Sequence, residues 1–223
     1  MRGKLIVLDG LDGSGKSTQA AMLAERLRAA GLRVQELSYP DYSQPSSALV
    51  KMYLNGELSA TADGVNAYAA SSFYAVDRYA SYLRFWKDRL EAGWNMVASR
   101  YVSSNAIHQM GKLPRVEWDA FLDWLEDYEY GKLGLPRPDR VIFLDMSRAV
   151  ADRLILARYH GDEAKKDLHE KNRAYLETCM ESAHYAAGRL GWQTIRCCDG
   201  NEAFPPEQIA EQVFQSVKGV IPF

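Results

Sequence analysis

The stretch GLDGSGKS, Gly10 to Ser17, decides the fold of this 223-residue chain. It satisfies the pattern GxxxxGK[ST], whose glycines let the backbone wrap a phosphate and direct successive N–H groups at it. The apolar run before it, Lys4 to Asp9, predicts a buried strand, and the helical spacing from Thr18 to Ala30 predicts a helix ending at Gly31. A strand before and a helix after are the context that the pattern requires, so the sequence predicts a phosphate-binding loop.

Each side chain of this loop has an expected task. Lys16 supplies a compact positive charge to the β- and γ-phosphates of a nucleotide, and the Ser17 hydroxyl is a ligand for Mg²⁺. The helix that follows turns the positive end of its dipole toward the phosphates. The loop residues that we expect to bind the nucleotide are Gly10, Gly13, Ser14, Gly15, Lys16, Ser17 and Thr18.

The rest of the chain alternates predicted strands with predicted helices. This alternation predicts an α/β fold: a five-stranded parallel sheet flanked by helices, in one domain of residues 1–223, with the site at the carboxyl ends of the strands. A polar, glycine-containing segment at 158–167 is expected to form a short lid. The further strands expected are Arg33–Tyr39, Asn95–Ser99, Arg140–Asp145 and Trp192–Cys197, and the further helices are Val65–Ala92, Arg115–Tyr130, Ser147–Tyr159, Lys165–Leu190 and Pro206–Val217.

Composition excludes several classes of protein. The net charge of −2, from 27 basic and 29 acidic residues, argues against nucleic-acid binding by bulk electrostatics. No apolar run approaches the ~20 residues that span a bilayer, and the N-terminus does not resemble a signal peptide, so we expect a cytoplasmic protein without a membrane partner. Three cysteines without CxxC spacing predict neither a disulfide framework nor a zinc site.

The chain lacks the marks of two large classes of phosphate-loop protein. It has no base-reading Asn/Thr-Lys-x-Asp segment, as a GTPase would, and no apolar strand ending in Asp-Glu, as motor-type ATPases usually have. Small-molecule kinases instead need a second anion pocket and a basic lid. Arg100, at the carboxyl end of a predicted strand, suits that pocket because its guanidinium can hold a phosphate with two hydrogen bonds.

A second candidate for the acceptor pocket lies on the helix around residues 73–78, FYAVDR. Tyr74 and Arg78 are four residues apart and therefore share one helical face. On one face, the aromatic ring can stack on a planar base while the guanidinium donates a hydrogen bond to a carbonyl of that base. An aromatic residue at helical spacing is also common in a core, so both interpretations of Tyr74 stay open.

With these motifs in this order, the chain resembles the thymidylate kinase family over nearly its whole length. The segments that carry the resemblance are LDGLDGSGKST from residue 8, YPDY and YLNGEL within 39–58, FYAVDR at 73–78, SRYVSSNAIHQ at 99–109, GLPRPDRVIFLD at 134–145 and RYHGDE at 158–163. The resemblance implies transfer of the γ-phosphate of ATP to dTMP with Mg²⁺, by a homodimer.

The resemblance also implies roles for single residues. Asp12 would lie near the acceptor sugar and the metal. Ser17, from the loop pattern, and Asp9, from its place at the end of the first predicted strand, are the other expected metal ligands. Lys16, Arg100, Arg158 and Asp12 would form the catalytic set. The implied acceptor contacts are Asp12 and Tyr39, Tyr74 at the place of a stacking Phe, Arg78 at a thymine carbonyl, Arg100 at the phosphate, Ser104, Asn105 and Gln109 near the base, and Tyr159 at the sugar.

Several positions depart from the pattern of the family. Gly13 stands where some members carry an Arg in the loop, so the missing charge is expected from the lid, first from Arg158 and otherwise from Arg153, Lys165 or Lys166. Ser99 replaces the usual Asp before Arg100, and Asp9 is expected to share its role. His108 stands at a frequent Tyr and is either a buried neutral side chain or a sugar contact. Leu154 replaces an adenine-packing Arg, which leaves adenine recognition open.

Two other functions are compatible with parts of the sequence. Ser99 and Tyr74 leave open a kinase for another deoxynucleotide or for a deoxynucleoside. A deoxynucleoside acceptor would need a general base, and no carboxylate clearly fills that role. A regulator that binds ATP without turnover is disfavoured because Lys16, Ser17 and Arg100 are all intact.

Overall fold

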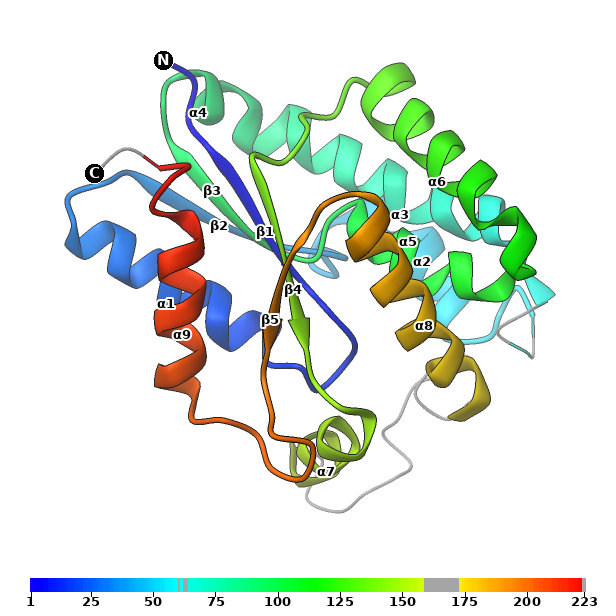
Figure 1. Cartoon of the computed structure of the whole chain (residues 1–223). Coiled ribbons are helices and arrows are strands. Elements are labelled where there is room, and N and C mark those ends of the chain that lie inside the picture. Colours follow the sequence, from blue (N-terminus) through cyan, green and yellow to red (C-terminus); the bar gives the residue numbers. More distant parts are fainter. Residues whose placement is uncertain (60, 62–63, 159–172, 222–223) are drawn as a thin grey trace.

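The computed structural model describes residues 1–59, 61, 64–158 and 173–221 of the chain. Five parallel strands form one sheet in the order β2-β3-β1-β4-β5 (Figure 1). The predicted α/β fold with a five-stranded parallel sheet is therefore confirmed. The strands are β1 (Leu5–Asp9), β2 (Val34–Ser38), β3 (Asn95–Ser99), β4 (Arg140–Asp145) and β5 (Gln193–Arg196).

Strand β1 occupies the centre of the sheet, and all five of its residues are buried. Its neighbours are β3, in the register Leu8 to Ser99, and β4, in the register Asp9 to Phe143. Parallel pairing in this register brings the carboxyl ends of β1 and β3 side by side. The phosphate loop after β1 and Arg100 after β3 consequently leave the sheet next to one another.

Helices cover both faces of the sheet. Their bounds are α1 (Lys16–Ala29), α2 (Ala48–Leu54), α3 (Ala67–Ser81), α4 (Lys87–Glu91), α5 (Ser103–His108), α6 (Trp118–Glu126), α7 (Arg148–Arg158), α8 (Arg173–Arg189) and α9 (Pro206–Val217). Short 3-10 turns are η1 (Pro45–Ser47), η4 (Met110–Lys112) and η5 (Arg115–Glu117), and π-helical turns are η3 (Tyr82–Trp86) and η6 (Asp127–Lys132).

The two faces of β1 belong to two separate layers of core. Ile6 and Leu8 pack with α1, α7 and α9 on one face, whereas Leu5 and Val7 pack with α3 to α6 on the other. This alternation follows from the period of two along a strand, and Figure 1 shows α1 and α9 on the side opposite α6 and α8. Within the described residues, every helix is too short or too polar to cross a membrane.

Most predicted elements have the expected type, with some differences at their bounds. β3 and β4 begin and end where predicted, while the helix expected over 65–92 is α3, the π turn η3 and α4 in succession. The helix expected over 115–130 likewise contains a 3-10 turn, α6 and the π turn η6. Helices α2 and α5 were not predicted. The predicted lid at 158–167 lies outside the described residues, apart from residue 158 at the end of α7.

Candidate active site

The phosphate loop connects β1 to α1 through glycines in left-handed conformations. Gly13 has φ +81° and Gly15 has φ +86°, angles that residues with a Cβ adopt only under strain. A Cβ on Gly13 would also lie 2.6 Å from the carbonyl oxygen of Ala151 on α7. Glycine at this position therefore allows the loop to pack directly against α7.

Lys16 folds back over the loop instead of extending into solvent. Its Nζ donates to the carbonyl oxygen of Leu11 at 2.7 Å and lies 3.8 Å from Oδ1 of Asp12, and the residue is only 6% exposed. One residue further on, the Ser17 hydroxyl lies 3.3 Å from that of Ser99 at the end of β3. The loop thus collects a positive charge and two hydroxyl groups at the carboxyl edge of the sheet.

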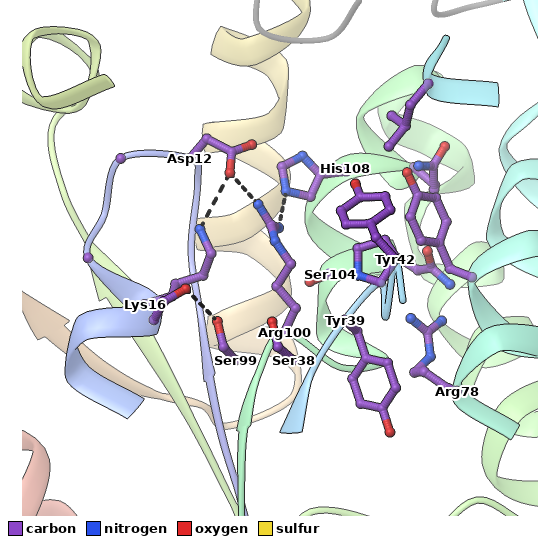
Figure 2. A pocket seen from close by; sticks show the side chains of 18 of the residues that line it. Asp12, Lys16, Ser38, Tyr39, Tyr42, Arg78, Ser99, Arg100, Ser104 and His108 are labelled. Atoms are coloured by element: carbon purple, nitrogen blue, oxygen red, sulfur yellow. Dashed lines mark hydrogen bonds and ion pairs between the residues drawn. The ribbon is translucent and has the colours of Figure 1, made fainter. Parts of the chain in front are cut away.

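Arg100 has a strained backbone that directs its side chain across this edge. Its φ of +68° is a left-handed conformation that costs a non-glycine residue ~1–2 kcal/mol, and its N–H donates to the carbonyl oxygen of Leu8 at 3.0 Å. The guanidinium donates to Asp12 through Nη2 and contacts Nε2 of His108 through Nη1 at 3.0 Å (Figure 2). Since an arginine is always a donor, Nε2 of His108 accepts in this contact.

The pair of Asp12 and Arg100 is ionised. Burial raises the pKa of Asp12, but the charges of Arg100 and Lys16 outweigh burial and hold that pKa well below its usual value. Burial lowers the pKa of Arg100, and Asp12 and Asp9 raise it by more. The guanidinium is consequently fixed in place and charged at any physiological pH.

One cavity of about 330 Å³ joins these groups. This volume lies in the range of small-molecule sites. The phosphate loop, the carboxyl ends of β2 and β3, and helices α3 and α5 supply most of its wall (Figure 2). The lining residues are Asp12, Gly13, Gly15, Lys16, Ser17, Thr18, Ser38, Tyr39, Pro40, Tyr42, Leu54, Tyr74, Arg78, Ser99, Arg100, Ser104, Asn105, His108, Gln109 and Tyr175.

The lining of the cavity also includes aromatic and amide side chains. Tyr74 packs edge-on against Tyr53, with ring centroids 6.4 Å apart. Arg78 and Asn105 are both buried and both contact Glu129. The Oε1 atom of Gln109 is buried and has no hydrogen-bond partner within the described part of the chain. Such an atom is costly unless a ligand or water satisfies it.

The model of the thymidylate kinase family matches residues 8–199 of the chain. The chain belongs to the thymidylate kinase family. Thymidylate kinase from Homo sapiens is 33% identical over 208 residues, which cover 91% of this chain and 86% of the relative. Thymidylate kinase from Mycobacterium tuberculosis is 30% identical over 191 residues, covering 84% and 87%. The chain is therefore an ATP-dependent nucleoside monophosphate kinase.

A solved structure of thymidylate kinase from Candida albicans has the same fold. It superposes with a TM-score of 0.69 at 20% identity, over 98% of this chain and 92% of the other. At this identity the likeness concerns the fold of the family. It agrees with the sheet order and helical layers described above.

The cavity brings together most of the residues expected from the family resemblance. Asp12, Lys16, Ser17, Arg100 and Tyr74 all line it, as do the remaining acceptor residues Tyr39, Arg78, Ser104, Asn105 and Gln109. Gly10 and Ser14 lie outside this lining, and the buried Ser14 hydroxyl has no partner among the described residues. Their roles in binding stay predictions.

Two expected residues, Tyr39 and Asp9, have other contacts in the structure. The Tyr39 hydroxyl donates to Ser81 at 3.1 Å and accepts from Nε1 of Trp86 at 3.0 Å, and burial raises its pKa to about 12. Figure 2 shows this hydroxyl turned away from Arg100, so only the rest of Tyr39 can face a ligand. Asp9 accepts from the hydroxyls of Ser103 and Ser104, at 2.6 and 2.7 Å.

These contacts change what we expect of Asp9. Its other oxygen, Oδ1, accepts from the N–H of Gly10 at 2.9 Å, and the residue is fully buried outside the cavity lining. Asp9 thus joins the end of β1 to the start of α5. The geometry favours this structural role over the metal ligand that the sequence suggested, and over compensation for Ser99.

The predicted lid cations are only partly described. The side chain of Arg158 and residues Tyr159, Lys165 and Lys166 lie outside the described residues. Arg153, on the surface of α7, donates to the carbonyl oxygen of Asn201.

The sequence analysis missed Glu129, the buried partner of Arg78. A signal for it exists: Leu122, Leu125 and Glu129 follow one another at helical spacing, so a carboxylate lies on an apolar face. A charge in that position is rarely buried without a partner. Tyr42, Leu54 and Tyr175 also line the cavity. Tyr42 and Leu54 belong to the segments YPDY and YLNGEL, but the sequence analysis gave none of the three a role of its own.

Proposed function

We propose that this member of the family transfers the γ-phosphoryl group of ATP to the 5′-phosphate of dTMP, forming dTDP in the cytoplasm. The observation that supports the proposal is one continuous cavity, with Lys16 at one end, Arg78 at the other and Arg100 between them (Figure 2). This order suits a donor phosphate, an acceptor phosphate and an acceptor base along one line. Phosphoryl transfer depends mainly on such positioning and on positive charge.

The phosphate loop would bind the donor. Lys16 would exchange its contact with the Leu11 carbonyl for the β- and γ-phosphates, while N–H groups of the loop and of the first turn of α1 cradle the same oxygens. Arg100 would hold the acceptor phosphate, and its ion pair with Asp12 keeps its fork oriented.

Mg²⁺ is expected to accompany ATP. The Ser17 hydroxyl and the Asp12 carboxylate line the cavity and offer the oxygen ligands that this cation prefers. No group of three or more His, Cys, Asp or Glu side chains suited to a metal occurs among the described residues, so phosphates and water would complete its coordination. Bound there, the ion would neutralise charge on the transferred group.

We assign Ser99 the task of orienting Ser17. Their hydroxyl oxygens are 3.3 Å apart, at the position where the family usually has an Asp. The missing charge of the loop at Gly13 is still expected from Arg158, and a sugar contact from Tyr159.

The test of the function is a steady-state assay with ATP and a panel of acceptors: dTMP, dUMP, dCMP, dGMP, AMP and thymidine. The highest kcat/KM is expected for dTMP because the cavity combines a phosphate-binding Arg100 with the hydrogen-bonding groups of Arg78 and Asn105. Turnover only with a purine monophosphate, or only with unphosphorylated thymidine, would refute the proposal. ATP binding without turnover of any acceptor would support the regulator instead.

We further propose that two copies of the chain associate through α3 and η3. Val76, Tyr79 and Leu83 lie at helical spacing on one face and are 46%, 37% and 49% exposed, and Phe85 nearby is 38% exposed. An apolar stripe of this kind on a surface helix is typical of an interface, and the family resemblance implies a homodimer.

Leu83→Asp is expected to shift the protein from dimer to monomer, because a carboxylate in an apolar interface loses its hydration without gaining a partner. Sedimentation velocity at several protein concentrations measures the change. The control is Val116→Asp, which introduces the same charge at a valine 88% exposed on η5. Identical sedimentation of the Leu83 variant and the wild type would refute this interface.

A further inference from the structure

Glu129 is a fully buried carboxylate in the π turn η6, behind the wall of the cavity. Its Oε2 accepts from Nε of Arg78 at 2.7 Å, and its Oε1 accepts from Nη2 of Arg78 at 2.6 Å and from Nδ2 of Asn105 at 2.9 Å. A bidentate pair of this kind is strong and directional. Glu129 therefore fixes two residues of the cavity wall at once.

The contact with Glu129 decides which way the Asn105 amide points. Its Nδ2 lies between two acceptors, Oε1 of Glu129 and the carbonyl oxygen of Ser71 at 3.2 Å. Neither acceptor can donate a proton, so the NH₂ group must face them and Oδ1 must face away. Asn105 lines the cavity, and no partner for its Oδ1 occurs among the described residues.

Arg78, next to Asn105, offers hydrogen-bond donors where Asn105 offers an acceptor. Its Nη1 donates to the carbonyl oxygen of Tyr101 at 3.3 Å, and its other two nitrogens bind Glu129. A guanidinium has five N–H groups, so donors remain for a ligand in the cavity that Arg78 lines. The wall consequently presents a donor next to an acceptor.

We infer that Glu129 determines which bases the acceptor site accepts, by fixing Arg78 as a donor and Asn105 as an acceptor. This inference rests on the proposed function, since it concerns the acceptor of that reaction. Thymine and uracil carry a C4 carbonyl beside an N3–H, which complements this pair. Cytosine carries an amino group beside an unprotonated N3, so it would oppose a donor to Arg78 and an acceptor to Asn105. Glu129 is a positioning residue, because it acts through its two neighbours.

The variant Glu129→Gln tests the inference. In this variant the amide NH₂ of the glutamine replaces one accepting oxygen of Glu129. Two donors would then face each other, so the Asn105 amide is expected to rotate and turn its own NH₂ toward the cavity. We expect kcat/KM for dUMP relative to dCMP, a pair that differs only at N3 and C4, to fall by about 10- to 100-fold, the effect of one mispaired buried polar group. The KM for ATP should not change.

Glu126→Gln is the matched control. It makes the same chemical change three residues earlier, where Glu126 pairs with Arg137 at 3.1 Å outside the cavity, and its dUMP-to-dCMP ratio should equal that of the wild type. An unchanged ratio in a folded Glu129→Gln, even with lower overall activity, would reduce Glu129 to a structural role and overturn the inference.

The wild-type protein provides a second measurement that does not depend on how the variant folds. Its affinity for dUMP should exceed that for dCMP, and N3-methylation of dTMP should weaken binding because the N–H that Asn105 accepts is lost. Equal affinity for dUMP and dCMP would overturn the inference while leaving phosphorylation of dTMP intact. Failure of the wild type to phosphorylate dTMP would instead refute the proposed function.

Discussion

Arg100→Ala is expected to lower kcat/KM for dTMP by about 10²–10³-fold, the effect of removing a charged group that positions and stabilises the transferred phosphate. Arg100 lies between the phosphate loop and the base end of the cavity, where its guanidinium is fixed by Asp12 and His108. Affinity for ATP should stay close to that of the wild type, because Lys16 and the loop remain. Steady-state kinetics with dTMP, together with ATP binding by calorimetry, measures both effects.

Arg100→Lys is the matched control for this prediction. Lysine retains the positive charge and carries a Cβ on the same left-handed backbone, but it lacks the two-pronged geometry of a guanidinium. Its activity should lie between those of the wild type and the alanine variant. An unchanged KM and kcat for dTMP in Arg100→Ala would remove Arg100 from the acceptor pocket.

The same variant should change the titration of Asp12. Burial raises the pKa of Asp12, and Arg100 and Lys16 lower it by more, so the native pKa lies well below the usual value. A lowered native pKa stabilises the fold above the ordinary pKa of aspartate, and this contribution is lost as the pH falls. Without Arg100 the pKa of Asp12 should rise, and the acid limb of the pH–rate profile should move to higher pH than in the lysine variant.

Sequence patterns predicted the parts of the fold that are determined locally. Strands β3 and β4 have the predicted bounds because each is an apolar run closed by a polar residue at the edge of the sheet. Helix α5 was missed because its six residues, SSNAIH, show no helical period. Its position depends instead on the hydroxyls of Ser103 and Ser104, which bind Asp9 across 94 and 95 residues of sequence.

In the site, too, the residues set by local sequence could be predicted, and those set by distant contacts could not. Arg100 and the loop could be predicted because each follows a strand in a parallel sheet, where the carboxyl ends converge. The direction of the Tyr39 hydroxyl could not, since it is set by Ser81 and Trp86 on α3 and η3. Glu129 was likewise missed because Arg78, its partner, is 51 residues away in the sequence.

Gly13→Ala is expected to destabilise the protein more than Gly15→Ala, because it adds a steric clash with α7 to the backbone strain. The substituted residue would keep φ near +81°, which costs ~1–2 kcal/mol. Its Cβ would also meet the Ala151 carbonyl oxygen at 2.6 Å, and relieving such overpacking costs a further ~1–3 kcal/mol. Urea unfolding, followed by circular dichroism, measures the total loss.

Gly15→Ala separates the two contributions. Gly15 has φ +86° and no atom within 4 Å of an added Cβ, so this variant carries the backbone strain without the clash. The difference in unfolding free energy between the two variants therefore reports the contact with α7. If Gly13→Ala were no less stable than Gly15→Ala, the loop would not be packed against α7 as described.

The contact at Gly13 also explains where the remaining catalytic charge has to come from. Some relatives carry an arginine at this position, but here the backbone of α7 occupies the space that the Cβ of such a side chain would need. Accommodating one would require α7 to move, and Val150 and Ala151 of that helix are packed into the core with Ile6 and Leu8. The cost of that movement favours a cation from another segment, and Arg158, at the end of α7, stays the predicted source.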